Sequence, residues 1–89
     1  MRPLYVSGGP PVEVEVDCYA GYKGDERPVR IRAGGSSWPV ETVLDQWYSP
    51  GEACFRVRAA GSTFLLRRHL DSDAWTLEAW RPRMRGAQP

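Results

Sequence analysis

The sequence predicts a small all-β domain, a five- or six-stranded antiparallel meander that forms an SH3-like barrel or a tight two-layer sandwich. Apolar and polar residues alternate with a period of two in several short stretches, and breaks rich in Gly, Pro and Ser separate them. The chain has 89 residues, which is too short for a second domain. Strands joined by short turns hide most of their edges when they curl into a barrel.

Two strands are predicted before residue 34. Residues 12–18 alternate between apolar and acidic side chains, the pattern of a strand with one solvent-exposed face. A turn is predicted at 21–26, after which residues 28–33 alternate again. The run Gly-Gly-Ser-Ser at 34–37 predicts a hairpin-type break.

Residues 38–48 are consistent with two structures. Their apolar side chains fit helical spacing at Val40, Val43, Leu44 and Trp47, and strand spacing at Trp38, Val40, Thr42 and Leu44. Val, Thr and Trp favour β structure, and the segment is short. We therefore expect a strand with a bulge or bend near Asp45, and a helix over Val40–Tyr48 stays the alternative.

The remaining strands are predicted at residues 55–59, 63–68 and 74–80, with turns between them. The single β domain then spans residues 12–80. Residues 1–11 are expected to form an irregular lead-in, and residues 81–89 a flexible basic tail. The side chains expected to point into the core are Val14, Val16, Cys18, Val29, Ile31, Val40, Leu44, Phe55, Val57, Phe64, Leu66, Trp75 and Leu77.

Charge and cysteine content restrict the function. The net charge of +1 argues against strong nonspecific binding to polyanions. The chain has neither an apolar run long enough to span a membrane nor the apolar segment of a signal peptide, so we expect a cytoplasmic protein. Cys18 and Cys54 are not part of a CxxC motif and are expected to stay reduced.

No residue set in the sequence predicts catalysis, a metal site or a cofactor. His69 precedes Asp71 and Asp73, but a solvated turn is the simpler interpretation, because metal sites usually draw on more ligands than this. The acidic side chains of residues 13–17 are expected to form cross-strand ion pairs with arginines of residues 30–32.

The candidate binding residues are Arg56, Arg58, Arg67 and Trp47. The arginines at positions 56 and 58 share one strand face and have no evident acidic partner in the sequence. Either Arg67 or Arg68 should share that face. Tryptophan, tyrosine and arginine dominate protein-binding hot spots, so a noncatalytic protein-interaction or accessory domain, or self-association, is the favoured function. Basic strands beside aromatic residues also suit single-stranded nucleic acid, which is the alternative.

A resemblance covers residues 12–80 and rests on five segments: 19–28 (YAGYKGDERP), 40–48 (VETVLDQWY), 55–58 (FRVR), 65–69 (LLRRH) and 75–77 (WTL). Their order and spacing resemble a family of small bacterial domains of unknown function. That family is similar to a module at the C-terminal end of some Y-family, lesion-bypass polymerase-like proteins. The resemblance implies a DNA-repair context for some relatives and supplies no catalytic residue. The sequence departs from the pattern at Cys54, where an aromatic residue is more usual.

The all-β prediction can be checked by far-UV circular dichroism. Because the period-two pattern continues between turn residues, we expect a spectrum dominated by β structure with little helical contribution. A helix of more than about three turns within 12–80 would contradict the fold class. Residues 40–48 are the place where such a helix would arise.

Overall fold

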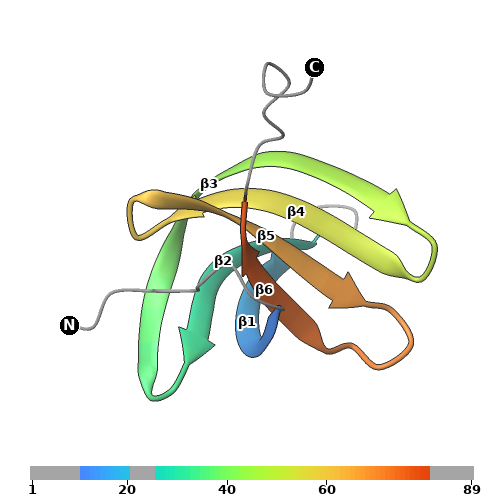
Figure 1. Ribbon diagram of the computed structural model, residues 1–89, viewed down its shortest axis with the longest axis horizontal. Helices are drawn as coiled ribbons and strands as arrows, with labels where there is room; N and C mark the ends of the chain where they lie inside the picture. The colour runs from blue at the N-terminus through green and yellow to red at the C-terminus, as the bar shows by residue number, and fades with distance from the viewer. Residues whose placement is uncertain (1–10, 21–25, 81–89) are drawn as a thin grey trace, which may run out of the picture.

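The computed structural model describes residues 11–20 and 26–80, and all its regular elements in these ranges are β-strands. Apart from Pro11, the predicted lead-in and basic tail lie outside the described residues. The six strands follow one another as an antiparallel meander, and Figure 1 shows their arrangement. They are β1 (Val12–Ala20), β2 (Glu26–Ala33), β3 (Ser36–Ser49), β4 (Glu52–Ala59), β5 (Ser62–His69) and β6 (Trp75–Ala79).

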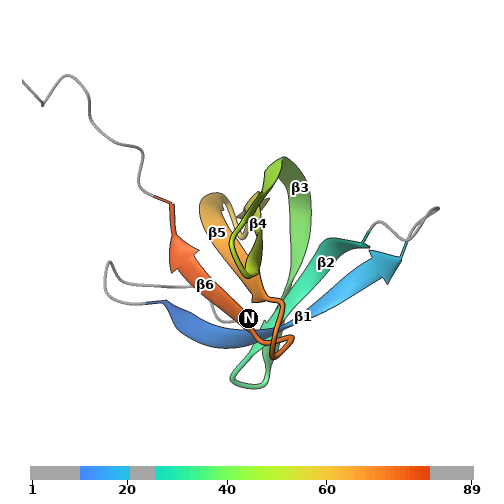
Figure 2. The same cartoon turned by 90° about the vertical axis from the view of Figure 1, so that its right-hand side faces the viewer.

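The strands close into a barrel, which confirms the predicted fold class. Each strand pairs antiparallel with the next, and β6 returns to pair with β1. Two strands change neighbours along their length. Residues 12–14 of β1 pair with β6 and residues 15–20 with β2, while residues 36–39 of β3 pair with β2 and residues 40–49 with β4. Figure 2 shows the resulting separation between the β1–β2 and β3–β4 hairpins.

The ambiguous stretch is a strand, and the predicted irregularity near Asp45 is present. The register of β3 against β4 shifts between Val40 and Thr42 and again between Val43 and Asp45. Each shift leaves one residue, Glu41 or Leu44, without a facing partner. An inserted residue bends a strand and increases its twist. The two bulges therefore accompany the turn of β3 from one neighbour to the other.

Most of the predicted core is confirmed. The buried members of the predicted set are Val14, Ile31, Phe55, Val57, Phe64, Leu66, Trp75 and Leu77, and the partly buried members packed against them are Val16, Cys18 and Val40. Trp38, Ala53 and Ala59 also belong to the core and were not predicted. Phe55 lies against Trp75 with ring centroids 5.6 Å apart, near the middle of this cluster.

The predicted burial of Val29 and Leu44 is wrong, since their exposed fractions are 43% and 41%. Both residues lie where the register shifts. Asp17 faces Arg30 and Cys18 faces Pro28, so Val29 has no facing residue on β1. Leu44 likewise has no facing residue on β4, because Val43 faces Val57 and Asp45 faces Arg56. A bulge interrupts the alternation of side chains. A strict period of two therefore assigns the wrong face at these positions.

We expect Phe55→Ala to lower the free energy of unfolding by about 3–5 kcal/mol, because it removes a buried aromatic ring and leaves a cavity. The measurement is denaturant unfolding followed by tryptophan fluorescence. Tyr48→Ala is the matched control, because that aromatic side chain is exposed and should cost less than about 1 kcal/mol. Equal stabilities of the two variants would show that Phe55 does not support the core.

Candidate functional site

The four predicted binding residues lie on one face of the barrel. Side chains alternate across a strand, and Phe55 and Val57 point into the core, so Arg56 and Arg58 point outward. The strand register places Trp47 and Arg67 on either side of Cys54 on the same surface. We call the outward side of β3, β4, β5 and β6 the outer face. The prediction that only one of Arg67 and Arg68 shares it is confirmed, because Arg68 faces the inward-pointing Trp75 and Ala53.

The prediction that Arg56 and Arg58 lack acidic partners is wrong. Arg56 Nη2 lies 2.5 Å from Asp45 Oδ2, and Arg58 Nε lies 4.0 Å from Glu41 Oε1. Both acids come from β3, where Asp45 faces Arg56 directly and Glu41 lies in the first bulge. The sequence does not reveal these pairs, because the positions of the two bulges decide which acid faces which arginine.

Arg67 is also paired, and it lies between two acids. Its Nε lies 3.7 Å from Glu52 Oε1, and its Nη2 lies 3.5 Å from Glu78 Oε2. The second carboxylate oxygen of Glu52 lies 3.6 Å from His69 Nδ1. The positive charges of the predicted arginines are therefore balanced within the outer face.

Arg56 is further restrained by an aromatic ring. Its guanidinium carbon lies 5.2 Å from the centre of the Trp80 ring, within the range of a cation–π contact. Its Nε is buried without a hydrogen-bond partner in the described structure. The ring and the Asp45 carboxylate together fix the position of this guanidinium, so Arg56 is not a mobile surface cation.

Two apolar side chains are buried on the outer face although no further layer covers it among the described residues. Cys54 is 2% exposed and Leu65 is also buried, yet neither belongs to the barrel core. Cys54 faces Trp47 and Arg67, and Leu65 faces Arg56. Long side chains can cover apolar neighbours with their stems while their charged ends stay in water. The outer face therefore has a small apolar layer of its own.

Two exposed aromatic residues lie at the end of β3. Trp47 is 37% exposed and Tyr48 is 70% exposed, next to a turn in which Gly51 has a φ of +76°. Pro50 precedes this glycine, which is the arrangement of a type II turn. Trp47 and Arg67 lie on either side of Cys54 in neighbouring strands. Trp80, in contrast, is half-buried beside Arg56. Trp47 is therefore the predicted site residue that offers an accessible aromatic ring.

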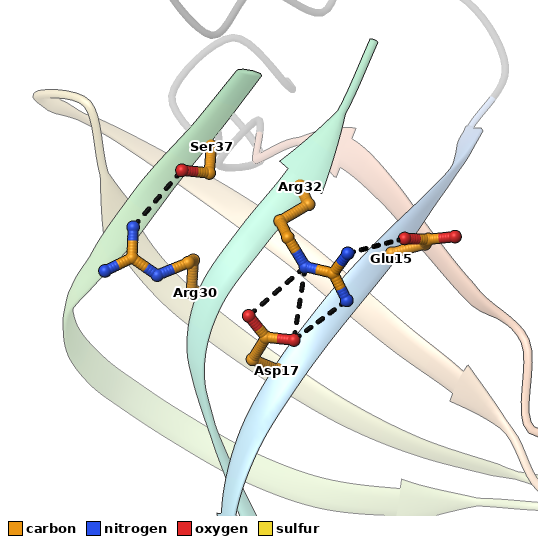
Figure 3. A network of polar contacts seen from close by, with 5 residues as sticks. All are labelled: Glu15, Asp17, Arg30, Arg32 and Ser37. Atoms are coloured by element: carbon orange, nitrogen blue, oxygen red, sulfur yellow. Dashed lines mark hydrogen bonds and ion pairs between the residues drawn. The ribbon is translucent and has the colours of Figure 1, made fainter. Parts of the chain in front are cut away.

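A second polar cluster lies on β1 and β2 (Figure 3). Arg32 lies 2.8 Å from Glu15 and 2.9 Å from Asp17, which confirms the predicted cross-strand pairing for this arginine. Arg30 instead donates to the hydroxyl of Ser37. The hydrogen bond to Asp17 and the charge of Asp17 are the main causes that raise the pKa of Arg32 above its ordinary value. Its ion pairs with Glu15 and Asp17 link β1 to β2.

The histidine segment does not form a ligand set. His69 Nε2 lies 3.4 Å from Thr76 Oγ1, and Asp73 accepts hydrogen bonds from Arg68 instead of turning towards the imidazole. Within residues 11–20 and 26–80, no three His, Cys, Asp or Glu side chains are grouped so that they could hold a metal ion. These side chains contribute to the polar network of the barrel surface.

Two open grooves flank β1. The first, of about 750 Å³, is lined by residues 13–15 and 32–37, and the second, of about 450 Å³, lies between residues 13–18 and 73–75. Neither is lined by Arg56, Arg58, Arg67 or Trp47. These two grooves therefore do not extend to the predicted binding residues.

Comparison of the chain with models of protein families, with curated proteins and with solved structures finds no match. In the described ranges there is also no helix with the length and apolar character that crossing a membrane requires. The resemblance to a family of small bacterial domains therefore stays a prediction.

The burial of Cys54 under the outer-face side chains can be tested with a thiol reagent. We expect the thiol of Cys54 in a Cys18→Ser variant to react slowly in the folded protein, because a buried sulfur is inaccessible. Adding Trp47→Ala should accelerate the reaction at least about tenfold, a change of about 1.4 kcal/mol in the free energy of exposing the thiol. Tyr19→Ala is the control and should leave the rate unchanged. Fast labelling without the Trp47 change would contradict this description of the surface.

Proposed function

We propose that the domain is a noncatalytic protein-interaction module whose contact surface is the outer face around Trp47. The observation that carries this proposal is the exposure of Trp47 at the end of β3, near Arg67, which is already ion-paired. Aromatic rings supply large contact areas at little cost in conformational entropy, and tryptophan, tyrosine and arginine are enriched in binding hot spots.

The charge balance of the outer face favours protein over nucleic acid. Binding to phosphates draws its affinity from lysines and arginines that neutralise the phosphates and release counterions. Here Arg56 and Arg67 already lie within 4 Å of carboxylates, so a phosphate would have to displace an acid or suffer its repulsion. A protein partner can use the planar guanidinium groups and the exposed rings without breaking these ion pairs.

The positions of the reactive side chains support a noncatalytic role. Cys54 is buried, with its sulfur 3.9 Å from Glu52 Oε1, and His69 lies beside the other oxygen of the same carboxylate. A catalytic group must reach its substrate within hydrogen-bonding distance, directly or through one water molecule. The thiol and the imidazole are instead both in contact with the Glu52 carboxylate.

The proposal predicts that Trp47→Ala weakens partner binding while the fold is retained. Immobilised wild-type domain and variant would be compared for proteins retained from native lysate treated with nuclease. Tyr19→Ala is the matched control, because it removes an exposed aromatic side chain from β1. The proposal requires that retained proteins be lost with the Trp47 change and kept with the Tyr19 change. Equal retention by both variants would contradict it.

Single-stranded nucleic-acid binding is the second candidate, because the outer face combines arginines with Trp47, and because the small bacterial family that the sequence is predicted to resemble is similar to a module of lesion-bypass polymerase-like proteins. A labelled oligonucleotide titrated with the domain at several salt concentrations distinguishes the two functions. We expect no saturable binding at physiological ionic strength. Salt-dependent binding that is lost in the double variant Arg56→Ala/Arg58→Ala would favour nucleic acid.

A further inference from the structure

The second half of β3 has an open edge. Its residues 40–49 pair with β4 on one side, whereas β2 pairs only with residues 36–39. Within the described parts of the chain no strand pairs with the other side of this stretch, and Figure 1 shows it along the rim of the sheet. An open edge presents backbone N–H and C=O groups that can pair with another strand.

The turn between β3 and β4 determines which residues have backbone groups on this edge. Ser49 and Glu52 flank the two turn residues, so they form the hydrogen-bonded pair that closes the hairpin. Hydrogen-bonded and non-hydrogen-bonded pairs alternate along antiparallel strands. Trp47 therefore bonds to β4 through its backbone, whereas the backbone groups of Gln46 and Tyr48 point to the open edge.

We propose that a second copy of this chain occupies the edge, with the two β3 strands antiparallel and related by a two-fold axis at Trp47. This inference rests on the proposed function, because it names the partner of the surface around Trp47. Gln46 of each copy faces Tyr48 of the other, and these residues exchange backbone hydrogen bonds. The sheet formed by β3 to β6 then continues from one barrel into the other.

The side chains of this register are self-complementary. Trp47 faces Trp47 of the second copy at a non-hydrogen-bonded position, where facing side chains approach most closely. Aromatic pairs at such positions stabilise antiparallel sheets. Asp45 faces Ser49, so no two like charges are directly opposed.

The bulge at Leu44 and the turn residue Pro50 limit the registers in which two β3 strands can pair. Pairing centred on Trp47 uses residues 45–49 of each copy, so the bulged Leu44 and the turn residue Pro50 stay outside the paired stretch. A two-fold axis one residue earlier, at Gln46, would require Tyr48 to pair with Leu44, where the bulge disrupts the regular spacing of backbone groups. The regular part of the edge therefore selects the Trp47-centred register.

The contact is small, since five residues of each copy pair, so the association should be weak. Interfaces below about 1,200 Å² are typical of transient complexes, and we expect a dissociation constant on the order of 0.1 mM. Sedimentation equilibrium of the purified domain up to about 1 mM should show a reversible monomer–dimer equilibrium, where this constant predicts mostly dimer. A monomeric mass throughout that range would overturn the proposal.

Gln46→Pro tests the backbone pairing. Proline removes an N–H group that points to the open edge, and β4 does not use it. We expect this variant to dimerise at least tenfold more weakly while its circular dichroism spectrum and melting temperature stay near those of the wild type. Tyr19→Ala should dimerise like the wild type. If Gln46→Pro is folded and dimerises normally, the edge is not the interface.

Disulfide trapping tests the register independently. In a Cys18→Ser/Cys54→Ala background, Trp47→Cys places the two thiols opposite each other across the two-fold axis, and mild oxidation should yield a covalent dimer within minutes. Asp45→Cys is the matched control, because that position faces Ser49 rather than itself and should cross-link at least tenfold more slowly. Equal cross-linking of the two variants would exclude the proposed register.

The same measurements separate this inference from the proposed function. A monomeric domain from which Trp47→Ala still removes a retained protein would keep the protein-interaction function and reject self-pairing. A dimer that is unaffected by the Trp47 and Gln46 changes would reject both the edge and the role of Trp47 in self-association.

Discussion

The change of neighbour within β3 is the constraint on which the rest of the barrel depends. This strand pairs with β2 in its first part and with β4 in its second, so it connects the two hairpins of the barrel. A straight strand of 14 residues would extend beyond a barrel this small. The bulges at Glu41 and Leu44 accompany the bend, and the closed pairing from β1 to β6 requires it.

The same bend determines the electrostatics of the outer face. The bulges align Asp45 with Arg56 and bring Glu41 near Arg58, while Glu52 and Glu78 lie on either side of Arg67. These ion pairs are partly exposed, so each contributes at most about 1 kcal/mol. Their larger effect is on recognition, because they leave a surface of balanced charge on which an exposed tryptophan is the distinct feature.

The bend also has a structural cost. Where β3 leaves β2, its backbone loses one neighbour, and the described part of the barrel keeps an open edge beside the exposed Trp47 and Tyr48. Proteins usually cover such edges or place bulges and charges on them. Here Leu44 and Asp45 protect the start of the edge, and residues 46–49 stay regular. The contact surface and the exposed backbone are thus two consequences of one change in strand pairing.

The sequence by itself determined the strands, the turns that lie within the described residues and most of the core. Alternation with a period of two, interrupted by glycine and proline, depends only on neighbouring residues, and it identified β1 to β6 and the burial of residues such as Ile31, Phe55 and Leu66. It also placed Arg56 and Arg58 on one strand face, whereas it left open which of Arg67 and Arg68 shares that face.

Only the tertiary structure decided the exposure of Val29 and Leu44, the acidic partners of the arginines and the open edge of β3. Each of these depends on register, which is the alignment of residues distant in sequence. One bulge shifts every later pair by a residue and reverses the face on which a side chain lies. Local patterns carry no information about such shifts, because the pairing of whole strands determines where an extra residue is accommodated.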